Sequence, residues 1–164
     1  MRKLSFALTP ILMAMVATGC QPPPEVEMEP ARTAQEVEAD FEATKAEWQS
    51  LANADDPAGV AALYTADAVF VDAFGNVYDG REAIQGYLEG SFPTASDIVI
   101  ETTSTIFHGD MVAAYGTFSQ TVAGPEGDMT MAGMWQTVSL YQPDGSVKLR
   151  MHHSMLPAEP PPPM

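Results

Sequence analysis

The chain has 164 residues, of which 46% are hydrophobic and 18% are charged, so it can form one domain with a hydrophobic core. Its 22 acidic and 7 basic residues give a net charge of −15. The sequence has no extended run of Lys or Arg, which argues against the basic surface that nucleic-acid binding requires.

The N-terminus has the pattern of a secretory signal peptide. Arg2 and Lys3 precede an apolar stretch over residues 4–16, which is too short for a membrane-spanning helix. The stretch leads into the small residues before Cys20, which is the only cysteine of the chain. A single cysteine excludes an internal disulfide bond and a thiolate metal cluster.

Residues 16–20, VATGC, resemble the lipobox of bacterial lipoproteins, in which the cysteine is lipidated and becomes the first residue of the mature protein. The resemblance implies a lipid anchor on Cys20 and a place in the cell envelope. Gln21 rather than Asp follows the cysteine, which by the same resemblance implies the periplasmic side of the outer membrane. The alternative is a chance cysteine behind an ordinary cleavage site.

Composition divides the chain into four parts. These are a signal peptide over residues 1–19, a Pro- and Glu-rich tether over 20–32, a folded domain over 33–157 and a Pro-rich tail over 158–164. The tether and the tail hold too few apolar residues for a core, so they favour extended or polyproline-like conformations.

Three helices are predicted in the first half of the domain. The first begins at Thr33, which forms a capping box with Glu36, and its apolar residues recur at spacings of three and four. A short second helix begins after Asp56 and runs through Tyr64. The third is predicted to begin with Asp79 as its capping residue.

Strands account for the rest of the domain. A short buried strand over residues 68–71 ends at Asp72, and a shorter strand over 77–78 follows it. Alternation of apolar residues then predicts four long strands, over residues 97–107, 111–122, 128–141 and 146–155. Three helices with an antiparallel meander indicate an α+β fold. We expect a strongly curved sheet wrapped over the helices, which leaves a cone with an interior pocket for a small ligand.

This order of elements resembles the nuclear transport factor 2-like superfamily, in its SnoaL-like and ketosteroid-isomerase-like branches. The most specific part is ALYTADAVFVDAFGNVYDGREAIQGYL at residues 62–88, and TAQEV at 33–37 resembles the start of the steroid isomerases. The resemblance implies a cone-shaped, cystatin-like fold and a homodimer formed through the outer sheet face. It does not fix the chemistry, because the fold hosts enzymes, binding proteins and assembly domains.

Asp72 falls where the steroid isomerases keep the carboxylate that moves a proton beside a carbonyl group. It is either a turn residue that caps its own backbone, or a pocket base whose pKa is raised by Phe70 and Phe74. The tyrosine and the protonated acid that stabilise the enolate in that family correspond by spacing to Trp48 and Thr137, so that pair of donors is not matched.

His153 is the second candidate catalytic residue. It shares the parity of Val147, Leu149 and Met151 on the last strand, so it is expected to point inward while His152 faces outward. The sequence HHS resembles the His-Ser ending of this strand in SnoaL-like proteins. The alternative is a core or pocket histidine that is bonded to a neighbouring side chain.

The predicted pocket is lined by Trp48, Tyr64, Phe70, Phe74, Met134 and Thr137. Core packing is the alternative for the aromatic residues. Three histidines without an i, i+4 pair predict no metal, and no cofactor is expected.

The sequence therefore predicts a lipid-anchored protein of the cell envelope whose domain binds a small, largely apolar molecule. One alternative is a proton-transfer enzyme of the isomerase, cyclase or dehydratase type, with Asp72 as its general base. The other is a non-catalytic domain that dimerises or binds a partner.

Overall fold

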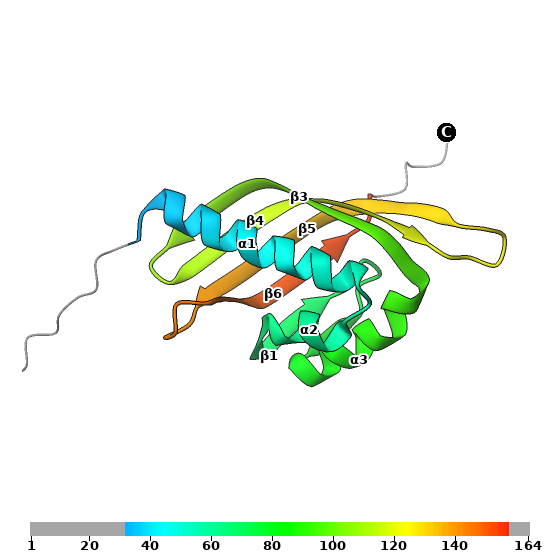
Figure 1. Cartoon of the computed structure of the whole chain (residues 1–164), viewed down its shortest axis with the longest axis horizontal. Helices are drawn as coiled ribbons and strands as arrows, with labels where there is room; N and C mark the ends of the chain where they lie inside the picture. The colour runs from blue at the N-terminus through cyan, green and yellow to red at the C-terminus, as the bar shows by residue number, and fades with distance from the viewer. Residues whose placement is uncertain (1–31, 158–164) are drawn as a thin grey trace, which may run out of the picture. The chain divides into compact units, whose positions relative to one another are not determined.

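The computed structural model describes residues 32–157, which form three α-helices and a six-stranded sheet (Figure 1). In chain order the elements are α1 (Ala34–Asn53), α2 (Pro57–Ala62), β1 (Tyr64–Val71), β2 (Val77–Asp79), α3 (Arg81–Ser91), a 3₁₀ turn η1 (Phe92–Thr94), β3 (Ala95–His108), β4 (Met111–Val122), β5 (Met129–Tyr141) and β6 (Val147–Met155). The predicted signal peptide, the tether up to residue 31 and the Pro-rich tail lie outside the described residues.

The strands of the sheet follow the order β2-β1-β6-β5-β4-β3. The four long strands form the predicted meander, because β3, β4 and β5 each pair antiparallel with the next strand along the chain. β1 pairs antiparallel with β2 on one side and parallel with β6 on the other. The α+β prediction is therefore confirmed, with one parallel pair in a sheet that was expected to be entirely antiparallel.

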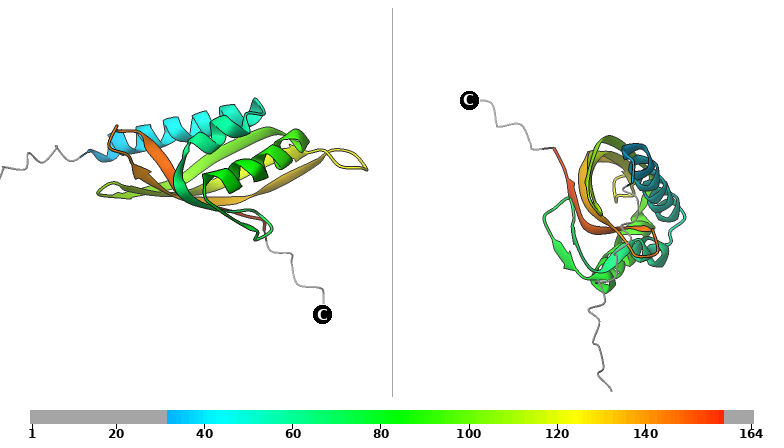
Figure 2. Two further views of the ribbon diagram at one scale, coloured as in Figure 1. Left: turned by 90° about the horizontal axis from the view of Figure 1, so that it is seen from below. Right: turned by 90° about the vertical axis from the view of Figure 1, so that its left-hand side faces the viewer.

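The sheet curls strongly in cross-section, and α1 lies across its concave face (Figure 2). Val37 and Phe41 on α1 are buried, and the Phe41 ring lies 6.2 Å from the ring of Trp135 on β5. A second group of buried residues packs between α2, α3, β1 and the start of β3. The core thus has two parts, and α1 contributes to both of them.

Local sequence signals account for the starts of two helices. Thr33 and Glu36 form the predicted capping box, in which the Thr33 amide donates to Glu36 at 2.8 Å and the Glu36 amide donates to Thr33 at 3.3 Å. Asp56 caps α2 through the amide of Gly59 at 2.8 Å. The predicted cap of the third helix is wrong, because Asp79 ends β2 and Gly80 precedes α3 without a side-chain cap.

The predicted second helix is too long. α2 ends at Ala62, and Tyr64 is the first residue of β1 instead of a helical residue. The reason is tertiary: the Leu149 amide donates to the Leu63 carbonyl at 2.9 Å, and Tyr64 pairs with Leu149 across β1 and β6. Strand pairing overrides the short run of helical spacing.

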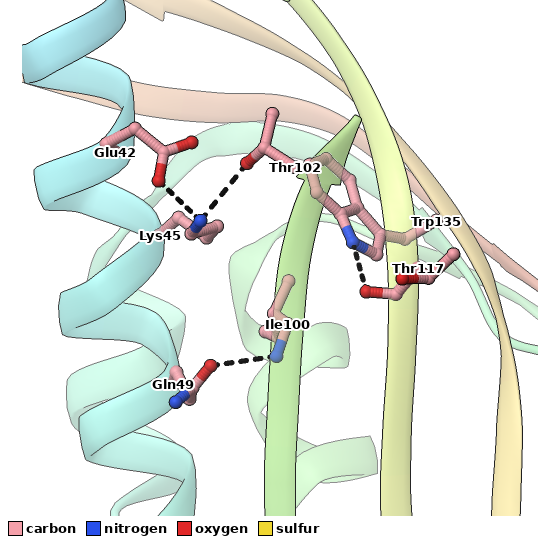
Figure 3. A network of polar contacts seen from close by, with 7 residues as sticks. All are labelled: Glu42, Lys45, Gln49, Ile100, Thr102, Thr117 and Trp135. Atoms are coloured by element: carbon pink, nitrogen blue, oxygen red, sulfur yellow. Dashed lines mark hydrogen bonds and ion pairs between the residues drawn. The ribbon is translucent and has the colours of Figure 1, made fainter. Parts of the chain in front are cut away.

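The side chains of α1 cover the free edge of β3. Three side chains one helical turn apart bond to alternate strand residues: Lys45 to Thr102, Gln49 to Ile100 and Asn53 to Ile98 (Figure 3 shows the first two). Asn53 both donates to and accepts from the Ile98 backbone at 2.8 Å, as a neighbouring strand would. The spacing fits because four helical residues rise about 6 Å and two strand residues about 6.6 Å. We call this row of hydrogen bonds between α1 and β3 the α1–β3 seam. It covers the edge of β3 that has no neighbouring strand, and it closes this side of the domain.

Candidate functional site

A cavity of about 220 Å³ lies between α1, α3 and the concave face of the sheet. Aromatic and aliphatic side chains dominate its wall, among them Phe41, Trp48, Phe70, Tyr87, Leu88, Ile98, Phe118, Trp135 and Leu149. Within the described residues, Lys45 is the only Lys, Arg, Asp or Glu that lines it. The Lys45 ammonium is paired with the carboxylate of Glu42 and donates to Thr102 at 3.1 Å (Figure 3). The cavity is therefore an apolar site of the kind that binds small organic molecules.

Trp135 forms one wall of the cavity and is locked in place. Its indole Nε1 donates to the Thr117 carbonyl at 3.0 Å (Figure 3). Gly116 provides the room, because a Cβ atom at that position would lie 2.8 Å from Cζ2 of Trp135. The same Cβ would lie 1.8 Å from the Glu101 carbonyl oxygen, so only glycine lets both β3 and the Trp135 ring pack this closely against β4.

Phe74 and Thr94 mark the rim of the cavity. They are the lining residues that are exposed, and Phe74 keeps 71% of its surface accessible. Phe74 lies in the loop between β1 and β2, and Thr94 lies in η1 just before β3. An aromatic side chain at this position can contact both solvent and a molecule in the cavity.

Three polar side chains form a chain of hydrogen bonds beside the cavity. Trp48 Nε1 on α1 donates to the hydroxyl of Tyr64 at 3.1 Å, and the same hydroxyl lies 2.7 Å from Nδ1 of His152 on β6. Trp48 and His152 line the cavity, while Tyr64 is fully buried behind them. Burial raises the pKa of Tyr64 well above its usual value, so the hydroxyl keeps its proton.

His152, rather than His153, points into the cavity. The predicted orientation is wrong because of a β-bulge: Leu149 pairs with Ser139 and Met151 pairs with Val138, so Arg150 is an extra residue on β6. The bulge reverses the parity of every residue that follows it. His152 is only 8% exposed, and burial together with the charge of nearby His153 lowers its pKa to about 3.

Thr137 lies directly opposite His152 in the pairing of β5 and β6. It lines the cavity and is buried, and its Oγ1 has no hydrogen-bond partner among the described residues. Ser139, the next inward residue of β5, also has a buried hydroxyl without a partner, but it does not line the cavity. Buried hydroxyl groups without a partner are uncommon, so the Thr137 hydroxyl is available to a bound molecule.

Asp72 is buried, but it is a turn residue and does not line the cavity. Its Oδ1 accepts the backbone amides of Phe74 and Asn76, both at 2.9 Å. Its Oδ2 accepts from the side chains of Asn76 at 2.8 Å and Tyr78 at 3.2 Å. The loop therefore supplies three donors and β2 a fourth to a single carboxylate.

The expectation of a raised pKa for Asp72 is also wrong. Burial acts to raise the pKa of the carboxyl, but the hydrogen bonds from Asn76, Phe74 and Tyr78 outweigh it, and the pKa lies below its usual value. The carboxylate is stabilised in its charged form, and four donors already occupy its two oxygens. This placement does not support the role of a general base.

The structure brings four of the six predicted lining residues to the cavity: Trp48, Phe70, Phe74 and Thr137. Tyr64 lies one step behind, bonded to two residues that line the wall. The prediction is wrong for Met134, which is 47% exposed on the outer face because it alternates with the inward residues Gly133 and Trp135. The same alternation would have identified Trp135 and Met131 as lining residues.

The described residues contain no group of three or more His, Cys, Asp or Glu side chains that could hold a metal ion. In the same part of the chain, none of the helices combines the length and the apolar character needed to span a bilayer.

Residues 45–145 match the sequence model of the SnoaL-like domain, which covers more than half of the chain, so this protein belongs to the SnoaL-like family. No curated protein sequence matches it significantly. The family explains the α+β architecture and the helix-covered interior of the sheet.

Several solved structures share this fold. A ketosteroid isomerase-like protein from Erwinia carotovora atroseptica is 17% identical, with a TM-score of 0.67 over 74% of this chain and 96% of that chain. A protein with a cystatin-like fold from Caulobacter vibrioides is 16% identical, with a TM-score of 0.65 over 75% and 91%. An NTF2-like protein from Novosphingobium aromaticivorans is 13% identical, with a TM-score of 0.61 over 74% and 82%. At these identities the likeness establishes the cystatin-like, nuclear transport factor 2-like fold alone.

Proposed function

We propose that this domain binds a small, largely apolar molecule in its interior cavity. The observation that carries the proposal is the cavity of about 220 Å³ with a wall of aromatic and aliphatic side chains and one paired charge. Pockets for drug-sized ligands measure about 300–1,000 Å³, so the ligand is smaller than a typical drug. The fixed rings of Trp135 and Trp48 and the closed α1–β3 seam favour a preformed site, which lowers the entropic cost of binding.

The experiment is a titration of the purified protein with naphthalene derivatives, followed by calorimetry at several temperatures. We expect binding with a negative heat-capacity change, because apolar surface is buried. Ala95→Leu adds bulk to a lining residue and should weaken binding. Ala83→Leu makes the same change at an exposed residue of α3 that does not line the cavity, and is the control. Equal binding by the two variants would contradict a site in the cavity.

Proton transfer with Asp72 as general base receives no support from the site. The carboxylate already accepts four hydrogen bonds, and it does not line the cavity. The binding role is therefore preferred over the enzymatic alternative.

We also propose that the outer face of the sheet pairs two copies of the chain. The register places six exposed apolar side chains on this face: Val99, Ile106, Met111, Tyr115, Met134 and Met151. Polar residues such as Glu101, Thr117 and Gln136 lie between them, and a mixed face that carries Met and Tyr side chains is typical of protein interfaces. A dimer through this face leaves the cavity on the opposite face of the sheet free, so assembly and ligand binding are compatible.

The proposed location is the periplasmic side of the outer membrane, with a lipid anchor on Cys20. The support is the sequence VATGC followed by Gln21, which lies outside the described residues. The Pro-rich segment after the cysteine would separate the domain from the lipid surface.

A further inference from the structure

We propose that the outer face of the sheet carries a site for a soft monovalent metal ion of the copper(I) class. Its ligands are the thioether sulfur atoms of Met134 and Met155 and the imidazole of His153. The site lies on the face of the sheet opposite the cavity, so this inference does not depend on the proposed binding of an apolar molecule.

The strand register brings the three side chains together. Met134 on β5 is paired directly with Met155 on β6, and His153 is two residues from Met155 along the same strand. Directly paired residues have Cβ atoms about 5 Å apart, and residues two apart on a strand are separated by about 6.6 Å. Their neighbours His152 and Ser154 line the cavity, so His153 and Met155 project from the outer face, as Met134 does. The three side chains therefore surround one point on the outer face.

The two thioethers can reach an ion at this point. Met134 and Met155 border a depression of the outer face, together with small residues such as Ala132 and Gly133. Met134 is 47% exposed and Met155 is partly exposed. A methionine side chain is unbranched and has three rotatable bonds, so each sulfur can turn toward an ion above the strands without a change in the backbone.

Gln136 orients the imidazole of His153. The two residues are paired across β5 and β6, and Nε2 of Gln136 lies 3.3 Å from Nδ1 of His153. A side-chain amide can present its oxygen to the ring as well as its nitrogen. With the oxygen turned to the ring, Nδ1 carries the proton and donates it, and the lone pair of Nε2 is free for a metal. A hydrogen bond to the other ring nitrogen is the usual support of a histidine ligand.

The donor set selects the metal. Thioether sulfur is an uncharged, soft donor that suits copper(I), and imidazole also binds copper. Zinc takes Cys, His and carboxylate ligands, and calcium takes oxygen ligands. Residues 32–157 contain no group of three or more His, Cys, Asp or Glu that could serve those ions. The histidine spacing and the single cysteine, from which no metal was expected, do not bear on thioether ligands.

The test is a calorimetric titration of the purified protein with silver(I), an air-stable ion of the same class, at a concentration at which sedimentation shows single chains. We expect one ion per chain, with shifted NMR signals for the ε-methyl groups of Met134 and Met155. The double variant Met134→Leu/Met155→Leu should lose at least about tenfold in affinity, because even the outer-shell partners of a metal contribute that much. His153→Gln should also weaken binding.

The matched control is Met111→Leu/Met129→Leu, which removes two other exposed thioethers and should leave the affinity unchanged. Leucine keeps the apolar volume of methionine in both double variants, so the fold and the pairing of copies are retained. Excess zinc(II) should not displace the silver(I). Equal affinities in the two double variants, displacement by zinc(II), or the absence of saturable silver(I) binding by the wild-type protein would overturn the inference.

Discussion

Asp72 holds Phe74 at the rim of the cavity. The carboxylate accepts the Phe74 backbone amide at 2.9 Å, and the Phe74 side chain remains 71% exposed at the cavity mouth. Asp72, which the sequence suggested as a possible general base, therefore has a structural role. It positions Phe74, the residue two places further along the chain that lies at the mouth of the cavity. Its three further hydrogen bonds, two to Asn76 and one to Tyr78, fix the turn that presents Phe74.

The first prediction concerns the stability of this turn. Asp72→Ala should lower the free energy of unfolding by about 2–3 kcal/mol, because four hydrogen bonds to a buried, charged acceptor are lost. Asp72→Asn keeps one acceptor oxygen but places an amide against two donors, so about 1–2 kcal/mol should be lost. Urea unfolding at pH 7 measures both variants. An Asp72→Ala variant as stable as the wild type would show that the hydrogen bonds do not hold the fold.

The same carboxylate should make stability depend on acid pH. Since the pKa of Asp72 is lower in the folded protein, the charged form contributes stability above the unfolded pKa of about 3.9. That contribution is lost as the pH falls through the folded pKa. As the pH is lowered below about 4, the free energy of unfolding of Asp72→Asn should therefore fall less than that of the wild type.

The second prediction concerns Phe74 as the rim residue. Phe74→Ala should change the free energy of unfolding by less than about 0.5 kcal/mol, because the side chain is mostly exposed. The dissociation rate of a bound naphthalene probe should rise several-fold in stopped-flow measurements, because the ring no longer covers the mouth. Val77→Ala is the control, since Val77 is 63% exposed on β2 and does not line the cavity. Equal rates in the two variants would contradict a role at the mouth.

The third prediction uses the buried histidine. The pKa of His152 falls to about 3 in the folded protein, against about 6.5 when unfolded, so the unfolded state binds a proton first as the pH falls. Stability should fall below pH 6.5, approaching about 1.4 kcal/mol per pH unit, until the pH nears the folded value. Urea unfolding at pH 7, 6 and 5 measures the slope. His152→Phe should flatten it, whereas His153→Ala should preserve most of it.

The fourth prediction concerns the anchor. Cys20→Ser removes the only cysteine, so the protein should move from the membrane fraction to the soluble periplasmic fraction. Mass spectrometry of the wild-type protein should show a lipid-modified N-terminal cysteine. A soluble wild-type protein that begins at another residue would contradict the lipoprotein proposal.

The fifth prediction concerns assembly. The purified wild-type domain should sediment as a homodimer at micromolar concentration, because the outer face carries the apolar side chains defined above. Met134→Glu places a charge in the centre of this face and should give monomers. Val77→Glu introduces the same charge at an exposed apolar residue of β2 and should leave the dimer intact. A wild-type protein that stays monomeric at high concentration would contradict the proposal.

The sequence by itself was sufficient for the features that depend on local chemistry. The Thr33–Glu36 capping box, the Asp56 cap and the long strands of the meander follow from side chains close together in the chain. Helical spacing placed Trp48 on the inward face of α1, and the apolar run before Asp72 indicated Phe70, whereas Thr137 was predicted from the family resemblance. These signals are short-range, so they needed no knowledge of which strand pairs with which.

Tertiary structure decided which polar groups face the cavity. The bulge at Arg150 arises from the pairing of β6 with β5, and it exchanged the orientations of His152 and His153 that simple alternation predicts. The role of Asp72 was settled by donors on Asn76 and Tyr78, which the β1–β2 turn brings to its carboxylate. Both outcomes depend on how strands pair in three dimensions, because one extra residue in a ladder reverses every side chain beyond it.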